Sequence, residues 1–219
     1  MDDGLKNGVG SGLLAQTATP KERIACRGEA AGATLFNERA LEARDLIWIA
    51  ILGSASRSAV DVENVESAVR AICADIWTPS PSLIGDAMEE MARAGHLQSA
   101  RAKSGEKLTA TPQGRDTLTL LLLIQTERPG TTLGQAGLRL KLAFIDFLPF
   151  DERRAQLQAA VEAHEEELAK KHKQCASCPH RGAFGKLWFV HDCERLRCDI
   201  ALLRSMSGFN TEPSFVGVE

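Results

Sequence analysis

Apolar residues recur at helical intervals through most of this chain of 219 residues. Between residues 37 and 127 the pattern predicts three helices, a short hairpin and a fourth helix. The first helix, capped by Asn37, is apolar on nearly every side as far as Gly53 and is therefore expected to be buried. The second begins at Asp61 and carries apolar residues on one face only, at spacings of three and four. Three helices followed by a hairpin predict a helical core with a small β-wing.

The segment that follows has the order helix, hairpin, helix. Ser80 is a good N-cap, Pro81 suits the first helical position, and Gly95 is a natural left-handed stop. Two short strands with a serine and a glycine at the turn come next, and Thr111 then caps another helix. This order is typical of a winged helix, in which one helix enters a groove of duplex DNA and a basic hairpin holds the backbone. The alternative is an ordinary helix and hairpin in an α+β domain.

The second half of the chain is helical in a different way. A break is predicted at Pro129–Gly137, then a short apolar helix, and then two long amphipathic helices over 151–173 and 183–206, joined by a loop at 174–182. Their apolar stripes are Leu157, Val161, His164 and Leu168 in one and Phe189, Cys193, Leu196, Ile200 and Leu203 in the other. Such a helical hairpin buries its stripes best against a partner copy, so residues 138–206 are predicted to dimerise. Packing on the N-terminal domain is the alternative.

Composition and charge indicate which segments are flexible and where the protein is located. Residues 1–36 are rich in Gly, Ala, Ser and Thr and are expected to be a flexible arm, with 207–219 as a tail. No apolar run reaches the roughly 18 to 20 residues of a membrane span, and the N-terminus lacks a secretion signal, so we expect a cytoplasmic protein without a membrane partner. The net charge of −3 means that any attraction to DNA must be local.

Several short segments resemble one family of regulators. Ser80–Gly95 looks like the recognition helix of PadR winged-helix transcriptional regulators, in its Ser-Pro start, apolar spacing and final glycine. Thr111–Gly114 resembles the family's Thr-x-x-Gly step out of the wing, Phe147–Arg154 the entry to its dimerisation helix, and Leu187–Met206 its final helix. The resemblance covers roughly residues 41–206. It implies a homodimeric repressor that grips double-stranded operator DNA and is released by a small effector, which in several such regulators is an aromatic or phenolic acid.

The predicted recognition helix departs from that family in its charge. Asp86, Glu89 and Glu90 stand where the family usually has basic residues, and carboxylates repel phosphates. Contacts to DNA are therefore expected from small polar residues near the helix start and from basic residues of the hairpin, with binding that weakens steeply as salt rises. The predicted DNA-binding residues are Thr78, Ser80, Ser82, Arg101, Lys103 and Lys107.

An effector site is expected where the winged helix meets the C-terminal helices, because the resemblance implies that position. Aromatic walls can stack on a ring, and a cation such as Arg139 or Lys141 can pair with a carboxylate. The predicted effector-binding residues are Trp48, Arg139, Phe144, Phe184, Trp188 and His191.

A cysteine motif carries the remaining candidate chemistry. Cys175 and Cys178 form a C-x-x-C pair followed by His180, a spacing that suits a zinc ion. A redox switch and unpaired loop cysteines are the alternatives, so no cofactor is expected unless zinc binds here. A thiol- or zinc-responsive regulator is accordingly one alternative function.

The chain shows no sign of catalysis. It has neither a glycine-rich phosphate loop after a strand nor a recognisable set of nucleophile and base, so we predict that it is not an enzyme. The acidic recognition helix keeps one more alternative open, a helical dimer that binds protein rather than DNA.

Overall fold

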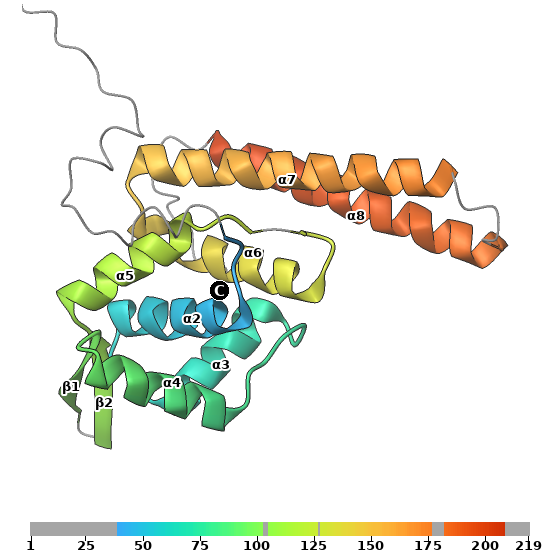
Figure 1. The fold of residues 1–219 in the computed structure, drawn as a ribbon. Helices are drawn as coiled ribbons and strands as arrows, with labels where there is room; N and C mark the ends of the chain where they lie inside the picture. Colours follow the sequence, from blue (N-terminus) through green and yellow to red (C-terminus); the bar gives the residue numbers. More distant parts are fainter. Residues whose placement is uncertain (1–38, 103–104, 127, 177–181, 209–219) are drawn as a thin grey trace, which may run out of the picture. The chain divides into compact units, whose positions relative to one another are not determined.

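The computed structural model describes residues 39–102, 105–126, 128–176 and 182–208, with backbone alone at 101–102, 105–106 and 175–176 (Figure 1). These residues belong to one unit, Leu35–Glu219. Mainly helical structure with one small antiparallel sheet confirms the predicted fold class. The elements are, in order, α2 (Ala43–Arg57), α3 (Val62–Cys73), α4 (Pro81–Arg93), β1 (Leu97–Ala102), β2 (Gly105–Ala110), α5 (Pro112–Leu123), α6 (Thr132–Phe144), the 3-10 helix η2 (Ile145–Phe147), α7 (Phe150–Ala176) and α8 (Ala183–Ser207).

Helix α2 forms the centre of the winged-helix core, as its apolar sequence predicted. Its largest buried side chains, Leu46, Ile49, Ile51 and Leu52, are fully enclosed. The predicted cap Asn37 lies outside the described residues, and Glu42 and Asp45 close the start of the helix with a capping box.

The predicted end of α2 at Gly53 is wrong, since the helix continues to Arg57. Gly53 serves close packing instead: a Cβ there would lie 2.6 Å from the ring carbons of Phe144 on α6. The side chain of Arg57 then secures the same contact from the helix end, because it donates to both carboxylate oxygens of Asp146 at 2.8 and 2.9 Å. The glycine therefore marks an approach of two helices rather than a stop.

Helices α3 and α4 begin at the predicted caps. The Asp61 carboxylate accepts a hydrogen bond from the Asn64 N–H at 2.8 Å, and the Ser80 hydroxyl accepts one from the Leu83 N–H at 3.4 Å. The stop at Gly95 is confirmed too, since its φ of +79° lies in the left-handed region that glycine adopts without strain. The two helices pack on each other and bury Val65, Val69, Cys73, Ile84, Met88 and Met91.

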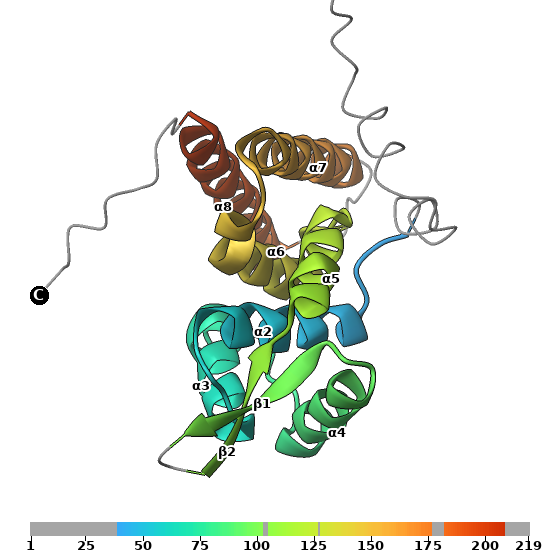
Figure 2. The same ribbon diagram turned by 90° about the vertical axis from the view of Figure 1, so that its left-hand side faces the viewer.

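The wing is an antiparallel hairpin whose register runs from Leu97 opposite Ala110 to Ala102 opposite Gly105 (Figure 2). A third piece of extended chain joins it: Val60 and Leu108 exchange backbone hydrogen bonds of 2.9 and 2.8 Å. The segment between α2 and α3 thereby holds the wing against the helical core.

Helix α6 begins inside the segment that was predicted to be a break. Thr131 caps it by accepting from the Gly134 N–H at 3.0 Å, so the break covers only the residues before it. Gly134 and Gly137 are buried within the helix. At Gly137 an added Cβ would lie 3.3 Å from Thr126 and 3.4 Å from Leu46, so this glycine again permits close packing.

Helices α7 and α8 form the predicted antiparallel pair, side by side in Figure 1. Leu157 and Val161 of α7 meet Ile200 and Leu203 of α8, and the cluster continues onto α6 through Leu138 and Leu142. The loop predicted from residue 174 is wrong for 174–176, which continue α7. Within the described residues, no helix is long and apolar enough to cross a membrane.

Candidate functional site

The start of α4 presents three of the predicted DNA-binding residues together on the surface. Thr78 is exposed in the loop before the helix, Ser80 is the N-cap, and Ser82 lies in the first turn. The hydroxyl oxygens of Ser80 and Ser82 are 3.0 Å apart and share a hydrogen bond. This end of the helix therefore offers small hydroxyl groups, which can contact phosphates and base edges.

The outer face of α4 is acidic, as its sequence indicates. Asp86 and Glu89 are exposed, and neither forms an ion pair among the described residues. Glu90 differs, because its carboxylate pairs with Arg44 of α2. Two unpaired carboxylates consequently remain on the surface that a recognition helix would turn to DNA.

Lys107 on β2 is engaged within the wing. Its ammonium donates to the Asn64 side-chain oxygen at 2.9 Å and lies 3.3 Å from a carboxylate oxygen of Asp61, and the side chain is 20% exposed. The Asn64 N–H and, to a smaller degree, Lys107 lower the pKa of Asp61. The structure thus gives Lys107 a role in fixing the wing to the start of α3. Of the other two predicted wing cations, Arg101 lies in β1 without a described side chain, and Lys103 lies outside the described residues.

The structure does not bring the six predicted effector-binding residues together in one protomer. Trp48 packs edge-on against His96, with ring centroids 5.6 Å apart, and Arg44 lies over its ring. Phe144 is buried beneath Gly53 on another side of α2. Arg139 is exposed on α6.

The remaining three of these residues lie on the first half of α8. Phe184 is 87% exposed, Trp188 is 67% exposed, and the Trp188 and His191 rings stack with centroids 5.1 Å apart. None of the six lines the cavity described next, so their part in effector binding stays a prediction.

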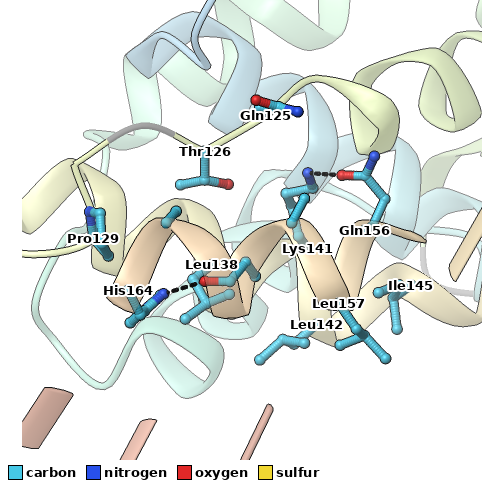
Figure 3. Close-up of a pocket in the computed structure, with 13 residues that line it drawn as sticks. Gln125, Thr126, Pro129, Leu138, Lys141, Leu142, Ile145, Gln156, Leu157 and His164 are labelled. Atoms are coloured by element: carbon cyan, nitrogen blue, oxygen red, sulfur yellow. Dashed lines mark hydrogen bonds between the residues drawn. The ribbon is translucent and has the colours of Figure 1, made fainter. Parts of the chain in front are cut away.

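A cavity of about 40 Å³ lies where the connection between α5 and α6 meets α6 and α7 (Figure 3). This is the junction at which an effector site was expected, and of the residues suggested for that site it is lined by one, the candidate cation Lys141. Its walls are largely aliphatic, with polar groups from a lysine, two glutamines, a threonine and a histidine. The lining residues are Gln125, Thr126, Pro129, Leu138, Lys141, Leu142, Ile145, Gln156, Leu157, Ala159, Ala160, Ala163 and His164.

Lys141 is the central polar group of this cavity. It is only 6% exposed, and its ammonium donates to the Ile124 carbonyl at 2.6 Å and to the Gln156 side-chain oxygen at 2.7 Å. The Gln156 amide in turn donates to the Leu123 carbonyl at 3.2 Å. These bonds tie α6 and α7 to the last carbonyls of α5. Burial lowers the pKa of Lys141 from its ordinary 10.5 to about 7.

Titration of Lys141 should make the stability of the protein depend on pH. Between pH 7 and 10.5 the unfolded chain binds more protons at this side chain than the folded one, so the free energy of unfolding should rise with pH. We expect a rise of about 1 kcal/mol per pH unit between pH 8 and 10 in wild type relative to Lys141→Met. Urea denaturation at several pH values measures it. The control Lys171→Met keeps Lys141 and should follow wild type, whereas parallel curves for wild type and Lys141→Met would contradict the burial of a titrating lysine.

The predicted zinc ligands fall outside what the structure describes. Cys175 is in the last turn of α7 with its side chain undescribed, and Cys178 and His180 are not described at all. Among the described side chains, no group of three His, Cys, Asp or Glu residues could hold a metal ion. Zinc at the C-x-x-C pair stays a prediction.

Comparison with known proteins places the chain in a family. The family model of AphA-like transcriptional regulators matches residues 36–207, while no curated protein matches. Among solved structures, Bacillus subtilis PadR in complex with p-coumaric acid is 18% identical, covering 77% of this chain and 97% of its own at a TM-score of 0.35. The same regulator with operator DNA is 18% identical, covering 74% and 97% at 0.35, and the PadR-like regulator BC1756 of Bacillus cereus is 10% identical, covering 76% and 96% at 0.34. These are members of the family that the sequence motifs resemble. The chain belongs to the AphA-like transcriptional regulators, whose role is regulatory and not enzymatic.

Proposed function

We propose that this protein is a homodimeric DNA-binding repressor that a small effector releases from its operator. The observation that carries the proposal is the winged-helix arrangement of α2, α3, α4 and the wing. In it the start of α4 is exposed, and the β-hairpin follows directly after that helix. Membership of a family of transcriptional regulators supports it.

The contacts to DNA would divide between the helix and the hairpin. Thr78, Ser80 and Ser82 would contact the backbone or base edges from the start of α4, and Arg101 and Lys103 would neutralise phosphates from the tip of the wing. Lys107 contributes indirectly, because its ammonium is bound to Asn64 and Asp61. In this arrangement α4 would fix the position of the protein along the DNA, and the wing would supply most of the positive charge.

Substitution of the acids on α4 tests whether the outer face of this helix turns toward DNA. In Asp86→Asn with Glu89→Gln, each dimer loses four negative charges from the face that we turn toward DNA, so affinity for a random duplex should rise about 10-fold. The ratio of operator to random binding should fall, since carboxylates that accept from a cytosine amino group favour particular bases. Fluorescence anisotropy with both duplexes measures this.

A matched control uses acids of α7. Asp151→Asn with Glu162→Gln removes the same charge from exposed positions there and should leave both affinities within about 2-fold of wild type. Equal affinities for the α4 variant and this control would show that the outer face of α4 does not approach DNA. That outcome would favour the alternative of a dimer that binds a protein partner, which the unpaired Asp86 and Glu89 also suit.

The dimer would form through the first half of α8. This helix carries two apolar stripes: one is buried against α7, and the other is exposed and has the helical spacing of a single face. Phe184, Leu187 and Trp188 on the second stripe are 87%, 66% and 67% exposed. Contiguous exposed apolar surface of this kind typically marks an interface between proteins. A second copy that presents the same stripe would cover it symmetrically.

Charge placed on that stripe should therefore separate the protomers. Leu187→Glu with Trp188→Glu would bury four carboxylates in a dimer interface, which costs several kcal/mol, so we expect a monomer at micromolar concentration. Sedimentation velocity reports the mass directly. Leu202→Glu, at an exposed position on the second half of α8, should remain dimeric. A double variant that sediments like wild type would place the interface elsewhere.

The effector is proposed to be an acid that binds at the junction of the winged helix and α7. Lys141, which is buried and carries its positive charge below its pKa of about 7, supports an acidic ligand. An aromatic or phenolic ring, which the family resemblance implies, would need more space than the cavity of about 40 Å³ provides. A thiol- or zinc-responsive role for the cysteine pair remains the alternative regulatory input.

A further inference from the structure

Lys141 is a buried cation without a counter-ion. The side chain is 6% exposed, and both of its hydrogen-bond partners, the Ile124 carbonyl and the Gln156 amide oxygen, are neutral. No described Asp or Glu forms an ion pair with it. An ammonium group has three N–H donors, so one donor is left over beside the cavity. A buried charge is costly unless it is paired, and a ligand that supplies a negative charge would remove that cost.

The cavity has room for a ligand of small size. Its volume of about 40 Å³ corresponds to about three water-sized groups, since one water needs roughly 10 to 15 Å³ on this scale. A carboxylate with one or two further carbon atoms has that size. Away from Lys141 the walls are aliphatic, with Leu138, Leu142 and Leu157 among them, and these suit a methyl or ethyl group.

Two more polar groups border the cavity. His164 lies at the end of the cavity away from Lys141 (Figure 3). Its Nδ1–H donates to the Ala160 carbonyl at 2.7 Å, which leaves Nε2 as a second polar atom of the ring. Thr126, half-buried in the connection between α5 and α6, adds a hydroxyl. Lys141 is the one lysine or arginine among the lining residues, which include no aspartate or glutamate, so a ligand with one negative charge matches its charge.

We propose that this cavity binds a compact monocarboxylate of the size of acetate or propionate, whose oxygens accept hydrogen bonds from the Lys141 ammonium. The proposal assigns both the site and the chemical class of ligand, and its regulatory consequence rests on the proposed function.

The regulatory consequence follows from the helices that Lys141 and Gln156 connect. They bind the carbonyls of Leu123, the last residue of α5, and of Ile124, its C-cap, to α6 and α7. Helix α5 starts directly after β2 of the wing. A carboxylate that accepts from the remaining donor would pull the ammonium toward the cavity, lengthen its bonds to the Ile124 carbonyl and Gln156, and so loosen the tie of α6 and α7 to the helix that follows the wing. Ligand binding would in this way alter how two winged helices of a dimer are spaced on DNA.

Thermal melting of the full chain tests the binding without DNA. At pH 6 and constant sodium concentration, replacing chloride by acetate or propionate should raise the Tm of wild type, by about 5 °C at fifty times the dissociation constant. For a ligand of four or five heavy atoms that constant should be in the millimolar range, roughly 0.1 to 10 mM. Lys171→Met should respond like wild type and Lys141→Met should not respond. No saturable rise in wild type, or an equal rise in Lys141→Met, would overturn the proposal.

A second variant keeps the test valid if Lys141→Met folds poorly. Ala163→Leu leaves the lysine in place and fills the cavity from α7, so it should lose the response to propionate. Benzoate tests the size limit, because its ring exceeds the cavity and should give no shift; a larger shift with benzoate than with propionate would contradict a compact ligand. Saturation-transfer NMR with acetate gives an independent measure of binding in every variant.

DNA binding separates this proposal from the proposed function. If propionate raises Tm through Lys141 and the protein binds no DNA, the site stands and the repressor proposal fails. If the protein binds DNA and no carboxylate raises its Tm, the repressor proposal stands and this one fails. Both are supported when propionate also shifts the DNA-binding midpoint of wild type and leaves that of Ala163→Leu unchanged.

Discussion

Removing two cations from the tip of the wing, in Arg101→Ala with Lys103→Ala, should weaken DNA binding about 100- to 1,000-fold at 0.1 M salt. Each dimer loses four positive side chains, and each phosphate contact adds about 0.9 to the slope of log affinity against log salt concentration. The magnitude of that slope should therefore fall by up to about 3.6. Fluorescence anisotropy between 0.05 and 0.3 M salt measures both quantities.

Two control variants separate wing contacts from general charge. Arg154→Ala with Lys170→Ala removes the same charge from exposed positions on α7 and should change the slope little. Lys107→Ala should leave the slope unchanged while lowering stability, because its ammonium is bound to Asn64 and Asp61. A wing variant with the salt slope of wild type would show that the hairpin does not touch the DNA backbone.

The second large effect is expected at Gly114, where α5 leaves the wing. A Cβ there would lie 2.2 Å from the backbone oxygen of His96, an overlap that no side-chain movement relieves. That oxygen is itself fixed, since it accepts from the Thr111 N–H at 3.0 Å and from the Thr111 hydroxyl at 3.1 Å. Gly114→Ala should cost about 3 kcal/mol of stability and lower Tm by roughly 10 °C.

Gly85→Ala is the matched control for this substitution. An added Cβ at Gly85, on α4, would meet only Val62 at 3.9 Å, an ordinary contact. Alanine is the better helix former, so Gly85→Ala should raise stability by about 0.5 to 1 kcal/mol. Calorimetry of both variants compares them. A Gly114→Ala protein as stable as wild type would mean that β1 and α5 shift apart freely, contrary to the close contact at His96.

The helix starts could be predicted from the sequence because capping is local. Asp61, Ser80 and Thr111 each accept a hydrogen bond from a backbone N–H three residues on, so the residue types carry the signal themselves. The same holds for Gly95 at the end of α4, where a positive φ selects glycine.

Two other glycine assignments failed for a common physical reason. Gly53 and Gly137 suggest a helix end and a loop, yet both lie inside helices at points where another element packs against the backbone. A glycine that admits Phe144 or Thr126 has the same sequence signature as a glycine that ends a helix. Only the tertiary contact distinguishes the two.

The candidate site shows a similar limit. Aromatic residues suggested effector walls, but Trp48, Phe144 and Trp188 lie in separate parts of the described protomer, with Phe144 buried in the core. Lys141 was one of the two candidate cations. The sequence gives a weak indication that it is buried, since it falls three residues after Leu138 on the buried face of α6. The sequence gives no such indication for its partner Gln156, because a polar residue in a charged helix usually faces solvent.

The central claim is that this chain is a DNA-binding regulator, and titration of the purified protein against duplexes from upstream of its own gene and its neighbours tests it most directly. The account predicts a shift that is steeply weakened between 0.05 and 0.2 M salt and is tighter for one fragment than for random duplex. No binding above that of random duplex, at the lower salt concentration and with thiols reduced, would contradict it and leave the acidic face of α4 as the surface for a protein partner.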